Sequence, residues 1–279
     1  MDKKHVASWW LQGWPSVWLS VQRDEYKNQI IKESFMTVCL RQSESVSDQS
    51  MRLDPYRSGL NLTTEFQQLA TRQSALPVPQ LVEQQAALSG PAGLFVKLSR
   101  QLRLYGRQAP SLEDLEWLRG RKRQSLAERA VQFALGQHCR RPEAANPFKG
   151  MLREDLCCIV FDDRSLHTLV ERYAAREALR QHDSEYFVKL IATTRETVER
   201  RIVFHGLLEH FDRLLPIEKS IYPLHYRAVQ QAHLDHEETL YGKLILDQPI
   251  SALLNMHSPE WLLNNLSSFE LSIDWERVG

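Results

Sequence analysis

The sequence predicts a mainly α-helical, bundle-like protein with a small minor β-sheet, a class that becomes α+β if the predicted strands pair. Apolar residues recur at spacings of three and four through residues 61–136 and 164–242, the period of an amphipathic helix. Three short segments, residues 35–40, 156–161 and 269–275, have the apolar or alternating pattern of strands. With 279 residues, 43% of them apolar and 25% charged, the chain can bury a sizeable core.

The first sixty residues are mixed in character. Pro15 is well placed to begin a helix, the segment 35–40 follows as a strand, and residues 41–51 form a polar loop. Lys3 and Lys4 precede a tryptophan-rich run that mimics a signal peptide, but Pro15 interrupts this run. We expect a terminal segment docked on the core rather than one lying at a membrane interface. No stretch approaches ~18 uninterrupted apolar residues, which predicts that the protein has no membrane span.

Short helices separated by glycine and proline are expected between residues 61 and 136. The sequence predicts them at residues 64–72, 79–88, 94–105, 111–120 and 122–135. Gly90, Gly106, Gly120 and Gly136 stand at or near the ends of four of these segments. Glycine is the preferred residue at a helix C-terminus because it adopts the left-handed conformation without strain. A run of such helices indicates a small helical subdomain.

A turn-rich stretch near residue 140 separates two expected domains. Residues 1–140 form a mixed and helical N-terminal region with a basic block, and residues 141–279 form a helical C-terminal domain that ends in an amphipathic strand. That terminal strand pairs with an internal strand or adds to a partner's sheet, and we prefer the internal sheet. The elements expected after the boundary are a buried strand at 156–161, helices at 165–180, 184–215, 223–242 and 258–266, and a strand at 269–275.

The cysteines indicate a reducing compartment. They are Cys39, Cys139, Cys157 and Cys158. No two of them form a C-x-x-C pair, so we expect no disulfide framework and a cytoplasmic location. Cys157 and Cys158 stand in an apolar run, where a thiol is expected to be unreactive. Asp162 and Asp163 follow this run, and we interpret them as helix caps in preference to metal ligands.

Five of the ten histidines fall within 32 positions of the C-terminal half, between His205 and His236. On a helix over residues 222–244, the three imidazoles share a face with five apolar or aromatic side chains; the set is Tyr222, His225, Tyr226, Val229, Ala232, His233, His236 and Leu240. We therefore expect these imidazoles to point inward with the apolar side chains. We favour hydrogen-bonded core or interface histidines over a metal site, and a pH-responsive switch is a third interpretation.

A metal site would use ligands from two helices. His233, His236 and Glu237 lie within one turn of helix, in the pattern H-x-x-H-E, and His205 or Glu209 from the preceding helix would complete the set. Histidine with carboxylate suits zinc or non-haem iron. The pattern has low specificity, so no cofactor is expected.

Formal charge is balanced overall, with 35 basic and 35 acidic residues, but it is uneven along the chain. Residues 97–149 carry twelve basic and five acidic residues, and residues 207–279 carry five basic and eleven acidic residues. Exposed guanidinium groups in the first block could bind phosphates. The candidate nucleic-acid-binding residues are Arg119, Arg121, Lys122, Arg123, Arg140 and Arg141. We favour solvated charges, or basic and acidic parts that face each other, over this interpretation.

No nucleophile elbow, P-loop, dinucleotide-binding or kinase motif is present in the sequence. The leading hypothesis is therefore a non-enzymatic protein-interaction protein, an adaptor or a subunit of a larger cytoplasmic assembly. A nucleic-acid-binding module that uses the basic block is the second hypothesis. A metal-dependent helical enzyme with a His/Glu site is the third. A protein partner is expected, and the sequence does not fix the oligomeric state.

Overall fold

The computed structural model describes residues 59–138, 144–192, 200–246 and 248–269. Within these ranges the chain forms α-helices and two 3-10 helices and no strand, which confirms the predicted mainly α-helical class. The elements are α4 (Gly59–Ser74), α5 (Val78–Ser89), α6 (Leu94–Tyr105), η1 (Gly106–Gln108), η2 (Pro110–Trp117), α7 (Arg121–Gln137), α8 (Arg153–Val160), α9 (Leu169–Ala192), α10 (Arg200–Arg213), α11 (Pro216–Lys219), α12 (Tyr226–Tyr241), α13 (Ile250–Met256) and α14 (Pro259–Phe269).

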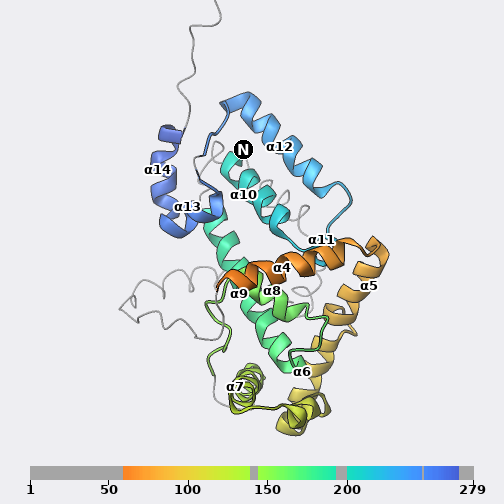
Figure 1. Cartoon of the computed structure of the whole chain (residues 1–279). Helices are drawn as coiled ribbons and strands as arrows, with labels where there is room; N and C mark the ends of the chain where they lie inside the picture. The colour runs from red at the N-terminus through yellow and green to blue at the C-terminus, as the bar shows by residue number, and fades with distance from the viewer. Residues whose placement is uncertain (1–58, 139–143, 193–199, 247, 270–279) are drawn as a thin grey trace, which may run out of the picture.

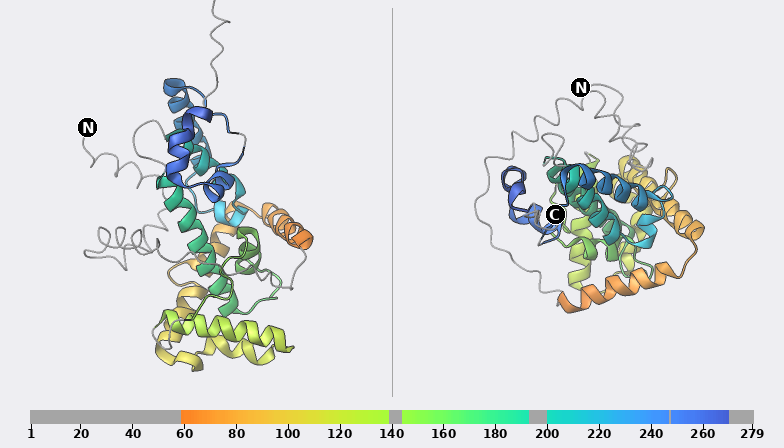
Figure 2. Two further views of the ribbon diagram at one scale, coloured as in Figure 1. Left: turned by 90° about the vertical axis from the view of Figure 1, so that its left-hand side faces the viewer. Right: turned by 90° about the horizontal axis from the view of Figure 1, so that it is seen from above.

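The long helix α9 connects the two ends of the described part of the molecule. It spans 24 residues, which is ~36 Å at the rise of an α-helix. Figures 1 and 2 show α6 and α7 packed towards one end of it and α10, α12, α13 and α14 gathered at the other. The described part of the molecule is therefore elongated, with two groups of helices joined by one continuous helix.

Two hydrophobic clusters correspond to these two groups. The larger cluster contains side chains from the helices α4 through α9 and from α11, and it includes Leu98, Leu102 and Leu179. The smaller one joins the end of α9 to α10, α13 and α14 around Leu190 and Leu254. The larger cluster thus draws on helices from both sides of residue 140. The predicted boundary itself lies in residues 139–143, outside the described residues, and stays a prediction.

The predicted strand at 156–161 is wrong, because this segment lies in α8 and its C-cap. The helix buries almost its whole circumference, including Leu156, Cys157 and Val160, so its apolar run carries no helical period. Glu154 and Asp155 lie in its first turn, where acidic side chains favour a helix N-terminus. Of the other two predicted strands, residues 35–40 and 270–275 lie outside the described residues, and Phe269 ends α14.

The helix ends predicted at Gly90 and Gly106 are confirmed, whereas Gly120 is the N-cap of α7 and Gly136 lies inside that helix, which ends at Gln137. Ser89 and Tyr105 end α5 and α6, and Gly90 and Gly106 follow directly as C-caps. The predicted break at residues 182–184 is wrong, since α9 runs through it without interruption. The segment predicted as a helix over 111–120 forms the 3-10 helix η2, which begins at a proline. None of the helices in the described part of the chain has both the length and the apolar composition that a membrane span requires.

Gly206 allows α10 to pack closely against α9. A Cβ atom at this position would lie 2.5 Å from Cδ1 of the fully buried Leu190 and 3.0 Å from the Tyr186 hydroxyl oxygen. The Tyr186 hydroxyl also donates a 2.9 Å hydrogen bond to the carbonyl oxygen of Gly206. The close approach of the two helices therefore depends on the missing side chain.

Gly206→Ala is expected to lower the free energy of unfolding by about 1–2 kcal/mol, because overpacking of the Leu190 side chain outweighs the higher helix propensity of alanine. Urea denaturation measures this change. In a Leu190→Ala background the same methyl group has room, and there it is expected to stabilise the protein. A stabilising effect of Gly206→Ala in the parent chain would contradict this packing.

Candidate interaction surfaces

The residues proposed as metal ligands lie on two helices that pack together, but they do not converge. His205 and Glu209 lie on α10, and His233, His236 and Glu237 lie on α12. Within the described ranges, no group of three or more His, Cys, Asp or Glu side chains has an arrangement that could hold a metal ion. The structure therefore gives no support to the predicted ligand set.

Each of these residues has another environment. The ring of His233 stacks on Phe204 with centroids 5.4 Å apart. Glu237 is buried and pairs with Arg200, 3.2 Å from Nη1 to Oε1. His205 Nε2 lies 3.4 Å from Oε1 of Glu238. Glu209 accepts hydrogen bonds from the backbone N–H and the hydroxyl of Ser251 and so holds α13 against α10. His236 is exposed.

The face that α12 buries overlaps the predicted face only at Tyr226. The buried side chains are Tyr226, Gln230, Leu234 and Glu237. Their position is set by contacts with α10: Tyr226 packs on Phe211 with ring centroids 5.2 Å apart, and Glu237 binds Arg200. The fully buried Arg201 donates from Nη1 to the carbonyl oxygens of Tyr241 and Gly242 and so fixes the C-terminal end of α12.

Most of the aliphatic and imidazole side chains that were expected to point inward are exposed instead, whereas His233 is half-buried against Phe204. Val229 is 47% exposed and Leu240 is 58% exposed, and Leu224, just before the helix, is 84% exposed. His225, Ala232 and His236 lie on the same side of the helix and are also exposed. We call this set the α12 stripe: Leu224, His225, Val229, Ala232, His236 and Leu240.

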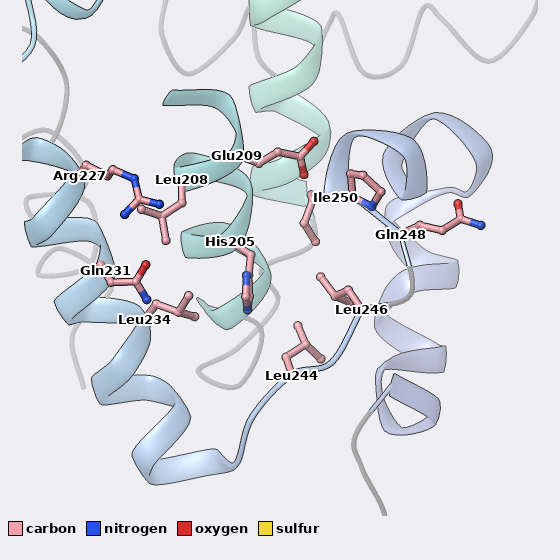
Figure 3. A pocket seen from close by; sticks show the side chains of 11 residues that line it. His205, Leu208, Glu209, Arg227, Gln231, Leu234, Leu244, Leu246, Gln248 and Ile250 are labelled. Carbon is pink, nitrogen blue, oxygen red and sulfur yellow. The ribbon is translucent and has the colours of Figure 1, made fainter. Parts of the chain in front are cut away.

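A cavity of about 490 Å³ lies on the other side of α12, between α10, α12 and the segment that leads into α13 (Figure 3). Leu208, Leu234, Leu244, Leu246 and Ile250 form its apolar walls. Three of the polar side chains at its rim already have partners within the protein: Glu209 binds Ser251, Arg227 pairs with Asp212, and Gln231 donates to Asp235. These groups hold the surrounding elements together, and His205 and Gln248 add further polar side chains to the lining.

The basic block is only partly available as a surface. Arg119, Arg121 and Lys122 are exposed around the turn between η2 and α7. Arg123 instead points inward, where Nη2 donates to the carbonyl oxygen of Leu166 and to Oε2 of the fully buried Glu171, 2.9 Å away. Arg140 and Arg141 lie outside the described residues. Three of the six predicted residues are therefore placed for contact with a partner.

Trp117 is the residue at this turn that sequence reasoning missed. Its side chain is 77% exposed, the most exposed aromatic residue among those described. Nearby, Asp114 lies in η2. It accepts a hydrogen bond from the backbone N–H of Leu169, the first residue of α9, and burial raises its pKa.

A buried ion network lies where α8, α9 and α11 meet. Arg153 of α8 donates to Asp183 of α9 from Nε at 2.9 Å and to Glu218 of α11 from Nη2 at 2.6 Å. Glu218 also accepts a hydrogen bond from the backbone N–H of Leu215 at the start of α11. The thiol of Cys157 is buried beside this network, and burial raises its pKa well above the usual value, in keeping with the expected unreactive thiol.

The ion network determines the charge states around it. Burial alone would raise the pKa of Asp183, but a hydrogen bond from His182 and the charge of Arg153 outweigh it and lower this pKa to about 2. His210 faces the same network from α10, between the rings of Tyr186 and Phe187. Its burial lowers its pKa to about 4. At neutral pH the network thus contains an ionised Asp183 beside an uncharged His210.

Asp162 and Asp163, the adjacent carboxylates after α8, hold the loop before α9. Asp162 accepts hydrogen bonds from the backbone N–H groups of Arg164 and His167, and Asp163 pairs with Arg72 of α4. They therefore fix a turn and an interhelical contact rather than cap α9.

No protein-family model matches the sequence, and comparisons with curated proteins and with solved structures find no match.

Proposed function

We propose that this chain is a non-enzymatic protein-interaction protein, an adaptor or a subunit of a larger cytoplasmic assembly, and that the α12 stripe binds an amphipathic helix of a protein partner. The observation that carries the proposal is the exposure of the stripe. The helix buries Gln230 and Glu237 and leaves Val229 and Leu240 in contact with water. Burying one such aliphatic side chain against a partner is worth about 1.5–3 kcal/mol.

The spacing of the stripe fits a helical partner. His225, Val229, Ala232, His236 and Leu240 follow at intervals of four, three, four and four residues, as in the seam between two packed helices. The stripe covers ~22 Å along the helix axis, or about four turns. Ala232 at its centre lets a second helix approach closely. A groove-bound or paired helix with aliphatic residues at the same spacing is therefore the complementary surface.

The charges on α12 favour a protein over a lipid surface. The helix carries one basic residue, Arg227, which is already paired with Asp212, and three acidic residues, Asp235, Glu237 and Glu238. Helices that lie on membranes instead carry a row of lysine and arginine beside their apolar face. We expect basic residues at the edges of the partner helix. The free thiols of Cys157 and Cys158 support the cytoplasmic location.

The test combines a photocrosslinker with a charge substitution. A benzophenone side chain at Ala232 in the full chain, expressed in its native cell, is expected to crosslink a partner through a segment with helical apolar spacing. With the purified partner, Val229→Glu with Leu240→Glu is expected to weaken binding at least about 10-fold, because two charges would be buried without partners. Titration calorimetry measures the change.

Val78→Glu with Leu166→Glu is the matched control, because these side chains are 62% and 57% exposed on other elements. This pair is expected to leave binding unchanged. Both double variants replace exposed residues and are expected to change the free energy of unfolding by less than about 0.5 kcal/mol per site. Crosslinks only between copies of this chain, binding to vesicles instead of a protein, or equal weakening by both pairs would each overturn the proposal.

A further inference from the structure

We propose that the end of the molecule formed by α6, η2 and the start of α7 binds single-stranded nucleic acid, with arginine side chains on the phosphates and Trp117 stacked on a base. This surface is separate from the α12 stripe, which lies at the opposite end of α9 (Figures 1 and 2). The inference therefore stands or falls independently of the proposed protein partner.

The turn between η2 and α7 presents its aromatic and basic groups together. Trp117 ends η2, Gly120 is the N-cap of α7, and Arg119 and Arg121 flank this glycine. Gly120 has φ +89°, a conformation that a residue with a side chain rarely adopts, and no atom lies within 4 Å of the position that a Cβ would take. The glycine thus shapes an open turn, on which a planar side chain and two guanidinium groups stand within five residues.

The neighbouring helix α6 carries further exposed basic residues. Lys97, Arg100 and Arg103 are exposed at intervals of three residues, and α6 packs against both η2 and α7. Across residues 94–138 there are eight exposed basic side chains and two exposed acidic ones. Some of these basic side chains have partners within the protein, among them Arg107, which pairs with Glu128. The exposed basic residues are Lys97, Arg100, Arg103, Arg107, Arg119, Arg121, Lys122 and Arg129, and the exposed acidic residues are Glu113 and Glu116.

The chemistry of this end selects the ligand. Guanidinium groups bind phosphate oxygens in a planar, bidentate geometry, so the exposed arginines suit a ligand that carries phosphate groups. An indole ring that is 77% exposed has its π-face available for an unpaired base. A duplex hides the faces of its bases within the stack, so it would use the arginines and leave Trp117 without a role. Among polyanions, a single strand therefore fits both kinds of side chain.

Fluorescence anisotropy of a labelled mixed-sequence 20-nucleotide DNA or RNA with the full chain, titrated at several salt concentrations, tests the inference. Arg119→Glu with Arg121→Glu is expected to weaken binding at least about 10-fold and to reduce the slope of log K against log salt by about 1.4, two phosphate contacts on a single strand. Trp117→Ala is expected to weaken binding about 5- to 150-fold, the range for loss of one stacked base.

Two matched controls exist within the chain. Lys189→Glu with Lys243→Glu makes the same change in net charge at exposed positions near the other end and is expected to leave the affinity within about 2-fold. Trp261→Ala removes a tryptophan from α14 and is expected to have no effect on binding. Absence of salt-dependent binding, equal weakening by either control, or equally tight binding of polyglutamate would overturn the inference. Binding of duplex DNA as tightly as single strands, with no effect of Trp117→Ala, would also overturn it.

Discussion

Arg153→Met is expected to lower the free energy of unfolding by about 3–5 kcal/mol, the range found when one partner of a buried ion pair is removed. The side chain of Arg153 is 10% exposed, and those of Asp183 and Glu218 are 15% and 12% exposed. Without the guanidinium group, two carboxylates would face each other in a site with little access to water. Urea denaturation followed by circular dichroism measures the loss.

The chain offers a matched control for this substitution. Arg72 also pairs with a carboxylate through two hydrogen bonds, to Asp163, but these side chains are 39% and 45% exposed. Arg72→Met is therefore expected to lower stability by no more than about 1 kcal/mol. Adding Asp183→Asn and Glu218→Gln to Arg153→Met is expected to restore part of the lost stability. Equal losses from Arg153→Met and Arg72→Met would contradict the description of a buried network.

The importance of Arg153 was not visible in the sequence, because its partners lie 30 and 65 positions away. The same contact explains why the predicted break in α9 does not exist. The sequence His182-Asp183-Ser184 has the polar character of a helix boundary, but in the structure Asp183 points to Arg153. A local pattern of polar residues cannot separate a helix end from a long-range ion pair.

Helix boundaries were predicted well where local chemistry sets them. Gly90, Gly106 and Gly242 each follow the last residue of a helix, because a glycine can leave the helical conformation without steric strain. The strand prediction at 156–161 was wrong because a run of apolar residues has no period of its own. Length and burial decide between strand and helix in such a run, and both depend on the rest of the fold.

The candidate surfaces also differ in whether local sequence or long-range contacts determine them. The basic turn at Arg119 and Arg121 could be identified from composition alone, since clustered charges outside a core must be solvated. The role of Arg123 could not, because its partner Glu171 lies 48 positions away. On α12, the apolar side chains suggested the buried face, yet the ion pair of Glu237 with Arg200 turns the helix so that the buried face shares only Tyr226 with the predicted one. The exposed stripe follows from that choice.

Acidification from pH 7 to pH 5 is expected to destabilise the protein by about 2 kcal/mol through His210 alone. Burial is the main cause of the fall in its pKa from 6.5 to about 4, and the nearby charge of Asp183 only partly opposes it. The unfolded chain therefore takes up a proton on this imidazole as the pH falls below about 6.5, whereas the folded chain does so only near pH 4. Stability due to this residue is complete above pH 7 and declines through that window.

The variant His210→Phe isolates this contribution. A phenyl ring fits the aromatic site, where the imidazole lies 4.7 Å from the ring of Phe187 and 5.7 Å from that of Tyr186, centroid to centroid. It cannot be protonated, so the variant is expected to lose about 2 kcal/mol less than the parent between pH 7 and pH 5. Asp183 contributes little in this range, because its pKa of about 2 in the folded chain and its ordinary value of 3.8 both lie below pH 5.

His236→Phe, at an exposed position on α12, is the matched control and is expected to keep the slope of the parent. Urea denaturation midpoints at pH 7, 6 and 5 give the three slopes. If His210→Phe and the parent lost the same stability over this range, His210 would not be a buried, uncharged neighbour of the Arg153 network. His210 would then carry a positive charge in the folded protein close to the charged guanidinium of Arg153. The repulsion between these two positive charges disfavours that arrangement.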